Sequence, residues 1–248
     1  MAPEDRDYMN RPMPESAYRR PGVRSVTFWI IVVNVAVFAI DRLLWHYGHF
    51  SQTILDTTRG PIALTFPVLY DFGYFSAALA VRNWEIWRFV TFQFIHASAE
   101  HLIFNMFALF FFGPLIEAYL TSRLFLPFYL LCGVGGAGMY LLLLLMGWRI
   151  GSAYVPLVGA SAGIFGILIA AARIAPDSTA EILGVIPIRM RTLAYYFILY
   201  AIFTVLFRGE NAGGEAAHLG GAAVGYLLLE WPEALERLAW LGRRAPPF

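Results

Sequence analysis

Residues 156–173 read PLVGASAGIFGILIAAAR and carry one charged side chain, at their last position. A helix needs about 20 mostly apolar residues to cross a bilayer, so this stretch predicts a membrane-spanning segment. Ser161 lies near its start, and His218 lies near the start of a second apolar stretch, 215–231. A hydroxyl and an imidazole at matching depths in lipid are the groups from which a serine nucleophile and its base are built. The two stretches together predict a membrane fold that holds a chemical site.

The composition of the whole chain also indicates a membrane protein. Apolar residues make up 59% of the 248 positions and charged residues 14%, whereas about a quarter of a soluble domain is charged. The mean hydropathy is +0.61. A net charge of +1 and the absence of lysine leave no basic surface, which excludes nucleic-acid binding. The single cysteine, Cys132, excludes a disulfide framework and a cysteine-rich zinc site.

Six segments are apolar enough to span a membrane, and their number predicts the fold class. The fold is expected to be an all-α polytopic bundle of six transmembrane helices. The segments are 26–45, 92–113, 124–147, 156–173, 192–208 and 215–231.

Three further regions are expected around these helices. Residues 1–24 are proline-rich and polar, which predicts a disordered cytoplasmic tail before the membrane domain, 25–231. The loop 46–91 mixes charged and aromatic residues and is expected in the outer headgroup region. Residues 232–248 predict a short amphipathic segment on the cytoplasmic leaflet.

The arginines predict the orientation of the bundle. If the N-terminal tail is cytoplasmic, 12 of the 18 basic residues fall on the cytoplasmic side and six on the outer side. Cytoplasmic loops carry the excess of arginine and lysine in membrane proteins. Both termini are therefore expected to be cytoplasmic, and Ser161 and His218 both fall near the outer surface.

Small residues predict that the helices carrying Ser161 and His218 pack closely. Gly221 and Gly225 form a Gly-x-x-x-Gly face one turn after His218, while Ala162 and Gly166 form a similar face beside the serine. Small residues four positions apart allow two helix backbones to approach each other in a membrane. A packing role without chemistry is the alternative interpretation of these faces.

A third polar cluster, 96–105, reads HASAEHLIFN. His101 and Asn105 are four residues apart and share a helix face, which fits a pair of hydrogen-bond donors for the negative charge that develops in acyl transfer. Two alternatives remain: the pair only ties helices together, or His96, Glu100 and His101 bind zinc. The spacing of the two histidines does not suit a helical zinc site.

The order of these motifs resembles the rhomboid family of intramembrane serine proteases over residues 26–231. The matching motifs are Trp87-Arg88, His96, His101-x-x-x-Asn105, Gly113-Pro-Leu-Ile-Glu117, Gly159-Ala160-Ser161 and Ala217-His218-x-x-Gly221-x-x-x-Gly225. Two positions depart from the family pattern: Ala162 follows the serine where many members have glycine, and Phe165 stands where many have tyrosine.

The resemblance implies a serine endopeptidase that cleaves transmembrane segments of other membrane proteins inside the bilayer. It assigns Ser161 as nucleophile and His218 as base, with His101, Asn105 and the Ser161 N–H holding the oxyanion. It implies no cofactor and no metal ion. The supporting residues would be Gly159, Phe165, His96, Gly221 and Gly225.

The resemblance also implies a location and further structural roles. The chain would be a multi-pass protein of a bacterial inner membrane, with substrate entry between the second and fifth helices. Glu117 would be structural, Trp87 and Arg88 would anchor the outer loop, and the glycine-containing loop 208–215 would be a flexible cap or an ordinary connector.

Two other functions are alternatives to an intramembrane protease. A non-catalytic rhomboid-like binding or quality-control factor would be expected to lack Ser161 or His218, and both are present. A small transporter would show a repeated half or broken helices with charges at the midplane, and the sequence shows no such repeat.

Overall fold

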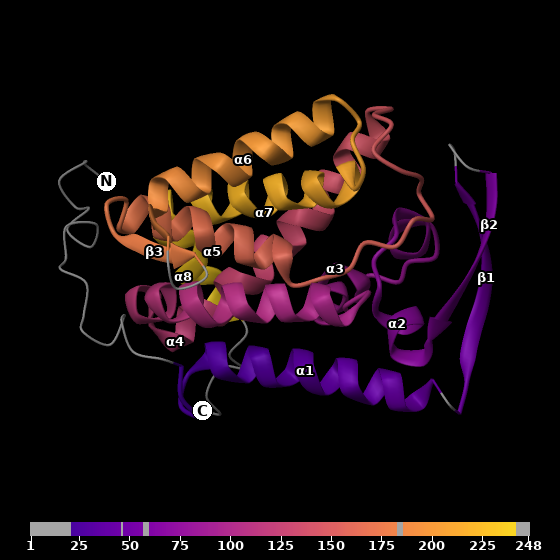
Figure 1. Ribbon diagram of the computed structural model, residues 1–248, viewed down its shortest axis with the longest axis horizontal. Helices are drawn as coiled ribbons and strands as arrows, with labels where there is room; N and C mark the ends of the chain where they lie inside the picture. The colour runs from indigo at the N-terminus through magenta and orange to yellow at the C-terminus, as the bar shows by residue number, and fades with distance from the viewer. Residues whose placement is uncertain (1–20, 46, 57–59, 183–185, 242–248) are drawn as a thin grey trace.

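Helices carry most of the chain in the computed structural model, which describes residues 21–45, 47–56, 60–182 and 186–241. Figure 1 shows α1, α4, α5, α6 and α7 side by side in one bundle. Their bounds are α1 (Val26–Leu44), α4 (Ala99–Leu145), α5 (Ser161–Ile174), α6 (Met190–Leu206) and α7 (Ala212–Glu230). The predicted helical bundle is present, and its members differ in length from the predicted segments.

The longest element, α4, consists of two helices joined at a break. Thr121 has φ 69° and ψ 153°, which is not a helical conformation and separates residues 99–120 from 122–145. A positive φ is costly for a β-branched residue, so the neighbours must hold this turn in place. Glu117 does so, because its carboxylate accepts a hydrogen bond of 2.6 Å from the Ser122 hydroxyl just after the break.

The same carboxylate fastens the start of α1. Glu117 is buried and accepts hydrogen bonds from the backbone N–H groups of Val26 and Thr27, at 2.7 and 2.9 Å, and from the hydroxyls of Ser25 and Thr27. The first N–H groups of a helix lack partners within the helix, and a negative charge is favoured there. This arrangement agrees with the structural role expected of Glu117.

Two of the predicted helix starts are wrong. The segment 92–113 begins with a short 3₁₀ turn (Phe92–Phe94), and α4 starts only at Ala99, where the Ser98 side chain accepts from the backbone N–H of His101 at 3.2 Å. The segment 156–173 begins in extended chain, because Leu157 pairs with Phe75 through two backbone hydrogen bonds. As a result α5 has 14 residues and starts at Ser161 itself.

Helix α1 has polar residues inside and apolar residues outside. Thr27, Asn34 and Asp41 are buried, whereas Trp29 and Leu43 are 54% and 66% exposed. This reverses the pattern of a surface helix in a soluble protein, and it suits a helix surrounded by lipid. Among the described residues, α1 and α4 are the helices long and apolar enough to cross a membrane, while α5 and α6 are apolar but shorter.

The segment between α1 and α4 is folded and only partly a surface loop. Strands β1 (His49–Asp56) and β2 (Gly60–Pro67) form an antiparallel hairpin at one end of the bundle (Figure 1), and α2 (Val68–Gly73), the π-helix η4 (Ala78–Arg82), α3 (Arg88–Thr91) and η5 (Phe92–Phe94) follow. Tyr74 and Phe75 are almost completely buried, so this part of the segment 46–91 packs against the protein, and its location in the outer headgroup region stays a prediction. Residues 46 and 57–59 lie outside the described chain.

Arg88 holds this outer segment together. Its guanidinium is buried and donates to the carbonyl oxygens of Asp71 and Tyr74, at 2.8 and 2.6 Å, and to the carboxylate of Glu85 at 2.6 Å. Trp87 donates from its indole to the Phe72 carbonyl and stacks on the Phe72 ring. Both side chains therefore anchor the segment to itself.

The opposite end of the bundle carries the remaining short elements. Strands β3 (Thr179–Ile182) and β4 (Ile186–Arg189) form a second hairpin, and α8 (Pro232–Leu241) follows α7. In α8, Leu235 is 1% exposed and belongs to the main core, so this side chain faces the protein, and the location of the segment 232–248 on the cytoplasmic leaflet stays a prediction. Residues 242–248 of that segment and 1–20 of the predicted tail lie outside the described residues.

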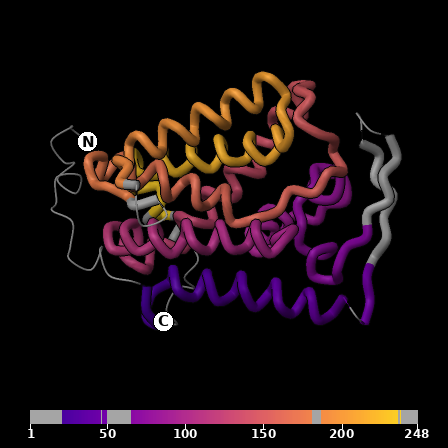
Figure 2. The backbone as a smooth tube through the Cα atoms, viewed as in Figure 1, coloured from indigo at the N-terminus to yellow at the C-terminus, as the bar shows by residue number. Residues whose placement is uncertain are grey.

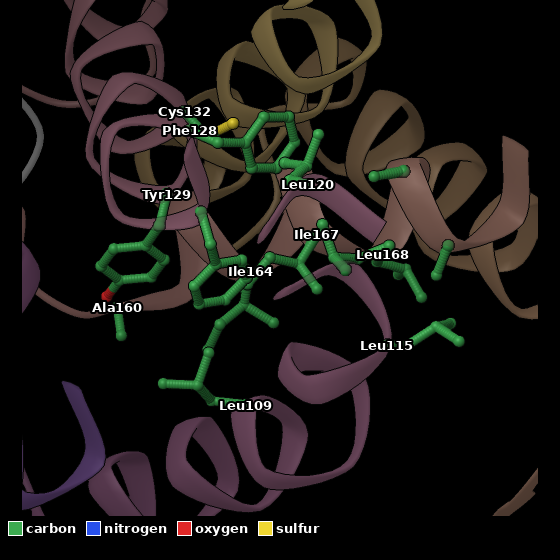
Figure 3. Close-up of a cluster of buried hydrophobic side chains, with 14 of the residues drawn as sticks. Leu109, Leu115, Leu120, Phe128, Tyr129, Cys132, Ala160, Ile164, Ile167 and Leu168 are labelled. Atoms are coloured by element: carbon green, nitrogen blue, oxygen red, sulfur yellow. The ribbon is translucent and has the colours of Figure 1, made fainter. Parts of the chain in front are cut away.

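The main core lies between the two parts of α4 and α5. Figure 3 shows Leu109 of the first part, Phe128 and Tyr129 of the second part, and Ile164 and Ile167 of α5 meeting in one cluster. Leu109, Phe128, Tyr129 and Ile167 have no exposed surface. This packing fixes α5, whose first residue is Ser161, against both parts of α4.

Helices α5 and α7 approach each other at their small residues. A Cβ atom added to Gly221 would lie 2.0 Å from the Ala162 carbonyl oxygen, and one added to Gly225 would lie 2.6 Å from the Gly166 Cα. Backbone therefore meets backbone at both positions. The methyl group of Ala162 points to α4, where a Cβ added to Gly136 would lie 2.6 Å from it; this accommodates the first departure from the family pattern.

Candidate active site

Ser161 is held at the N-terminus of α5 by the chain that precedes it. The segment 146–160 returns from the end of α4 to the start of α5 (Figure 2) and is fixed by the pairing of Leu157 with Phe75 and by a 3.0 Å hydrogen bond from the Gly159 N–H to the Phe92 carbonyl. As the first residue of the helix, Ser161 has a backbone N–H without a partner in the preceding turn. Such an N–H favours a nearby negative charge.

His218, 57 residues away in sequence, meets this serine. The Nε2 atom of His218 lies 2.8 Å from the Ser161 Oγ. The imidazole is stacked on the Phe165 ring, with centroids 4.1 Å apart and planes at 10°. The structure therefore brings together the hydroxyl, the imidazole and the ring that were selected from the sequence.

Glu215 is a third member of the cluster that sequence reasoning missed. Its Oε2 lies 2.9 Å from His218 Nδ1, on the side of the ring away from Ser161. Glu215 is the last residue of the predicted connection 208–215 and the first of the predicted span 215–231, and in the structure it lies in the first turn of α7. The i, i+3 spacing of a carboxylate and a histidine within the predicted span was the available signal.

His101 and Asn105 also reach the site from the first turns of α4. Gly159 has φ +116°, and a Cβ atom there would lie 2.7 Å from His101 Nε2. Glycine adopts this conformation readily and lets the His101 ring approach the backbone beside Ser161. Asn105 is buried and donates from Nδ2 to the His101 carbonyl at 2.9 Å, which leaves its second amide hydrogen for another acceptor.

His96 lies beside these residues, away from the cavity. It is 2% exposed, and its ring meets that of His101 at 67° with centroids 5.1 Å apart. Burial, and secondly the neighbouring His101, lowers the pKa of His96 to about 3. Among the described residues, no three His, Cys, Asp or Glu side chains are grouped as metal ligands would be.

A cavity of about 1640 Å³ contains the cluster. Ser161, His218, His101 and Asn105 all line it, and so do aromatic side chains of two helices, namely Phe104, Phe107 and Phe111 of α4 and Phe197 of α6. Ligand pockets are typically apolar with a few polar groups that converge. This one therefore combines an apolar path between α4 and α6 with a polar end.

The connection between α6 and α7 also lines the cavity. Arg208 and Asn211 line it and both have positive φ, 56° and 63°. Gly213 and Gly214 belong to α7, so the predicted flexible cap at 208–215 is shorter than expected. A Cβ atom at Gly213 would lie 2.7 Å from the Tyr140 ring, which shows that this helix start is closely packed.

Comparisons with known proteins agree on one family. The family model of the Rhomboid domain matches residues 83–231. The chain is 26% identical to RHOMBOID-like protein 4 of Arabidopsis thaliana over 257 residues, which cover 92% of this chain and 59% of that protein. It is 25% identical to the rhomboid protease AarA of Providencia stuartii, covering 84% and 72%, and 24% identical to the rhomboid protease GlpG of Photorhabdus laumondii, covering 77% and 68%.

Proposed function

This chain belongs to the rhomboid family, whose members are integral membrane proteins and include proteases, and on this premise we propose that it is a serine endopeptidase that cleaves transmembrane segments of membrane proteins. The hydrogen bond between Ser161 Oγ and His218 Nε2, at 2.8 Å, carries the proposal. A nucleophile and its base must lie within about 2.6–3.2 Å to exchange a proton. The cavity around them admits the water that hydrolysis needs.

The proposed reaction is acyl transfer through Ser161. His218 Nε2 accepts the proton from the Ser161 hydroxyl while Oγ attacks the carbonyl carbon of the scissile peptide bond. The resulting oxyanion accepts hydrogen bonds from the Ser161 backbone N–H, from His101 and from the Asn105 amide. His218 then gives the proton to the leaving nitrogen and the C–N bond breaks. A water molecule, deprotonated by His218, attacks the acyl carbon, the bond from this carbon to Ser161 Oγ breaks, Oγ takes the proton from His218, and the product leaves as a carboxylic acid that ionises in water.

The shape of the cavity favours a helical substrate that enters between α4 and α6. Apolar rings on both sides, such as Phe107 and Phe197, suit the side chains of a transmembrane segment. The carbonyl groups of a helix are engaged in internal hydrogen bonds, so the substrate must unwind locally before attack. Glycine, alanine, serine or proline near the scissile bond make this easier.

The proposed orientation places the site toward the outer surface of a bacterial inner membrane. The helix starts that carry Ser161, His218 and His101 gather at the cavity, and the arginine distribution favours cytoplasmic termini. In this proposal residues 25–231 form the membrane domain.

The test is cleavage and active-site labelling by the full chain in detergent. The wild type is incubated with transmembrane peptides that carry glycine, alanine or serine near one end, and the products are identified by mass spectrometry. A fluorophosphonate should add covalently to Ser161, and a chelator should leave the cleavage rate unchanged. Ser161→Ala should abolish labelling and cleavage, and His218→Ala should reduce both by at least a thousandfold, because the two groups act as a unit.

His49→Ala is the matched control for His218→Ala. His49 stacks on Trp45 at the start of the outer hairpin, and its replacement should leave cleavage and labelling unchanged. Cleavage by Ser161→Ala at an appreciable fraction of the wild-type rate would overturn the serine mechanism. A folded wild type that neither cleaves nor reacts would favour a rhomboid-like binding factor over an enzyme.

A further inference from the structure

The carboxylate of Glu215 is placed where the third member of a serine protease triad would act. One line of hydrogen bonds joins Glu215 Oε2 to His218 Nδ1 at 2.9 Å and His218 Nε2 to Ser161 Oγ at 2.8 Å. We propose that Glu215 is a positioning residue that completes a Ser161–His218–Glu215 triad. This inference rests on the proposed function and adds a residue to its mechanism.

The chemistry of the three groups fixes the direction of each hydrogen bond. An ionised carboxylate only accepts hydrogen bonds, so the proton of a neutral His218 must be on Nδ1. The lone pair of Nε2 then faces Ser161, whose hydroxyl donates to it. This is the tautomer that a general base needs, and a carboxylate at Nδ1 is the usual means of selecting it.

The ring contact with Phe165 does not supply the same restraint. A stacked ring at 10° limits the tilt of the imidazole, but both ring faces of a histidine are equivalent for stacking, and the contact does not distinguish Nδ1 from Nε2. A hydrogen bond in the plane of the ring does distinguish them. Phe165 and Glu215 therefore restrain His218 in two different ways.

The burial of Glu215 supports its hydrogen bond with His218, because a buried carboxylate needs a partner. Its side chain is 9% exposed and that of His218 is 15% exposed. A carboxylate is costly to bury unless it is paired or hydrogen-bonded. Glu215 lies in the first turn of α7, where the helix N-terminus favours a negative charge.

The position of Glu215 is set by the same helix that carries His218. The i, i+3 spacing places both side chains on one face of α7. The Glu215 N–H donates to the Asn211 carbonyl at 3.0 Å, which anchors the first turn. The distance between the carboxylate and the imidazole therefore stays constant when α7 moves as a unit.

In the reaction, Glu215 would act through His218 and would not touch the substrate. When His218 takes the proton from Ser161 it becomes an imidazolium, and the negative charge 2.9 Å from Nδ1 stabilises it. The proton stays on the imidazole until the leaving nitrogen takes it. The carboxylate remains ionised throughout, so no proton is transferred to it.

The test replaces the carboxylate by its neutral isostere. Glu215→Gln should lower kcat for transmembrane peptides, and the rate of fluorophosphonate labelling of Ser161, by roughly ten- to a thousandfold, because charge and tautomer control are lost. KM should change by less than about threefold and the melting temperature in detergent should stay near that of the wild type. Glu215→Asp, which keeps the charge on a shorter side chain, should recover part of the rate.

Glu230→Gln is the matched control, because Glu230 ends the same helix, pairs with Arg173 at 3.4 Å and is not among the residues that line the cavity. It should label and cleave at the wild-type rate. The triad is overturned if folded Glu215→Gln acts as fast as the wild type, or if its loss of activity equals its loss of folded protein. Either result for Glu215→Gln leaves the proposed protease function intact. A wild type that is neither labelled nor cleaves peptides would overturn the protease function and the triad together.

Discussion

His218 is the base of the proposed reaction. The contacts of its imidazole explain why phenylalanine is acceptable at position 165. The Phe165 ring stacks on the imidazole with centroids 4.1 Å apart, and the Phe165 ring also meets the Phe197 ring at 6.0 Å. An aromatic face in contact with the imidazole needs no hydroxyl to limit the tilt of the ring. Packing against Phe165 thus limits the tilt of the His218 ring, while the hydrogen bond to Glu215 limits the rotation of this ring in its plane.

Replacement of Phe165 by alanine is expected to loosen this histidine. The cleavage rate and the fluorophosphonate labelling rate should fall by roughly tenfold or more, because small errors in the position of a catalytic group are costly. Phe165→Tyr keeps the stacked face and should retain the wild-type rate within a few-fold. Both rates are measured on protein that has been shown to be folded by its melting temperature.

Phe203→Ala controls for the loss of an aromatic ring from the membrane domain. Phe203 lies on α6 and is 61% exposed, so its removal should leave the labelling rate unchanged. Wild-type activity in Phe165→Ala would mean that the stacked ring contributes nothing to the position of His218.

The site residues were predictable where the type of side chain itself indicates the chemistry. Ser161, His218, His101 and Asn105 were selected from spacing and depth, and the structure gathers them at one cavity. Glu215 was not selected, because it falls at the boundary between the connection 208–215 and the predicted span 215–231, and a carboxylate after Gly213 and Gly214 resembles a loop residue. In the structure α7 starts at Ala212, and Glu215 and His218 lie on the same face of this helix.

At the scale of elements, the contact between α5 and α7 sets the distance between nucleophile and base. Gly221 lies one turn after His218, and its Cα faces the carbonyl of Ala162, the neighbour of Ser161. The two helices therefore touch through backbone atoms beside the reactive pair. A flexible side chain can adjust to an added methyl group, whereas a backbone carbonyl inside a helix cannot.

Gly221→Ala should therefore separate the two helices and impair the site. The added Cβ would lie 2.0 Å from the Ala162 oxygen, and overpacking of this kind costs about 1–3 kcal/mol. We expect a lower melting temperature in detergent and at least a tenfold loss in the labelling rate of Ser161. The control is Gly138→Ala in α4, where an added Cβ meets nothing within 4 Å.

Gly138→Ala should keep the wild-type melting temperature or raise it slightly, because alanine is the better helix former. If Gly221→Ala were as stable and as reactive as Gly138→Ala, the close contact between α5 and α7 would not determine the geometry of the site.

The elements themselves were predictable to different degrees for a physical reason. Apolar residues in a membrane segment look alike whether the chain is helical or extended, so nothing in residues 156–160 reveals the pairing of Leu157 with Phe75. The cap at Ser98 is a signal in the sequence, since serine before a helical run is a common N-cap, but the predicted segment starts at residue 92 and does not use it. The break at Thr121 falls between the predicted segments 92–113 and 124–147, whereas the contact of Glu117 with α1 beside it depends on the tertiary structure.

At the scale of the whole molecule, large apolar side chains are exposed on the outside of the bundle and polar side chains are buried inside it, as suits a protein surrounded by lipid. The buried face of α1 combines the polar Thr27, Asn34 and Asp41 with Ile30, and Thr27 lies where a Cβ on Gly113 of α4 would come within 2.5 Å of it. The outward faces of α1, α4 and α6 carry large apolar side chains, such as Ile103 at 62% and Tyr195 at 65% exposure. Composition predicts this environment, because no soluble core of this size could bury so much apolar surface.

Orientation in the membrane follows from charge, and it can be tested with single cysteines. Tyr47, 89% exposed, lies between α1 and the outer hairpin, while Glu233 is exposed at the start of α8 at the opposite end. The native Cys132 is completely buried, so the wild type should show little reaction with a thiol reagent. Either position can therefore carry the reporter cysteine.

In intact bacteria, Tyr47→Cys should react with a membrane-impermeant maleimide, and Glu233→Cys should react only after the membrane is permeabilised. The reason is that, in the predicted topology, 12 of the 18 basic residues fall on the cytoplasmic side, and cytoplasmic segments carry the excess of positive charge in membrane proteins. The opposite pattern of labelling would place the hairpin, and with it the end of the cavity that holds Ser161 and His218, toward the cytoplasm. Substrates would then have to be cut near their cytoplasmic ends, which the mass of the released fragments would report independently.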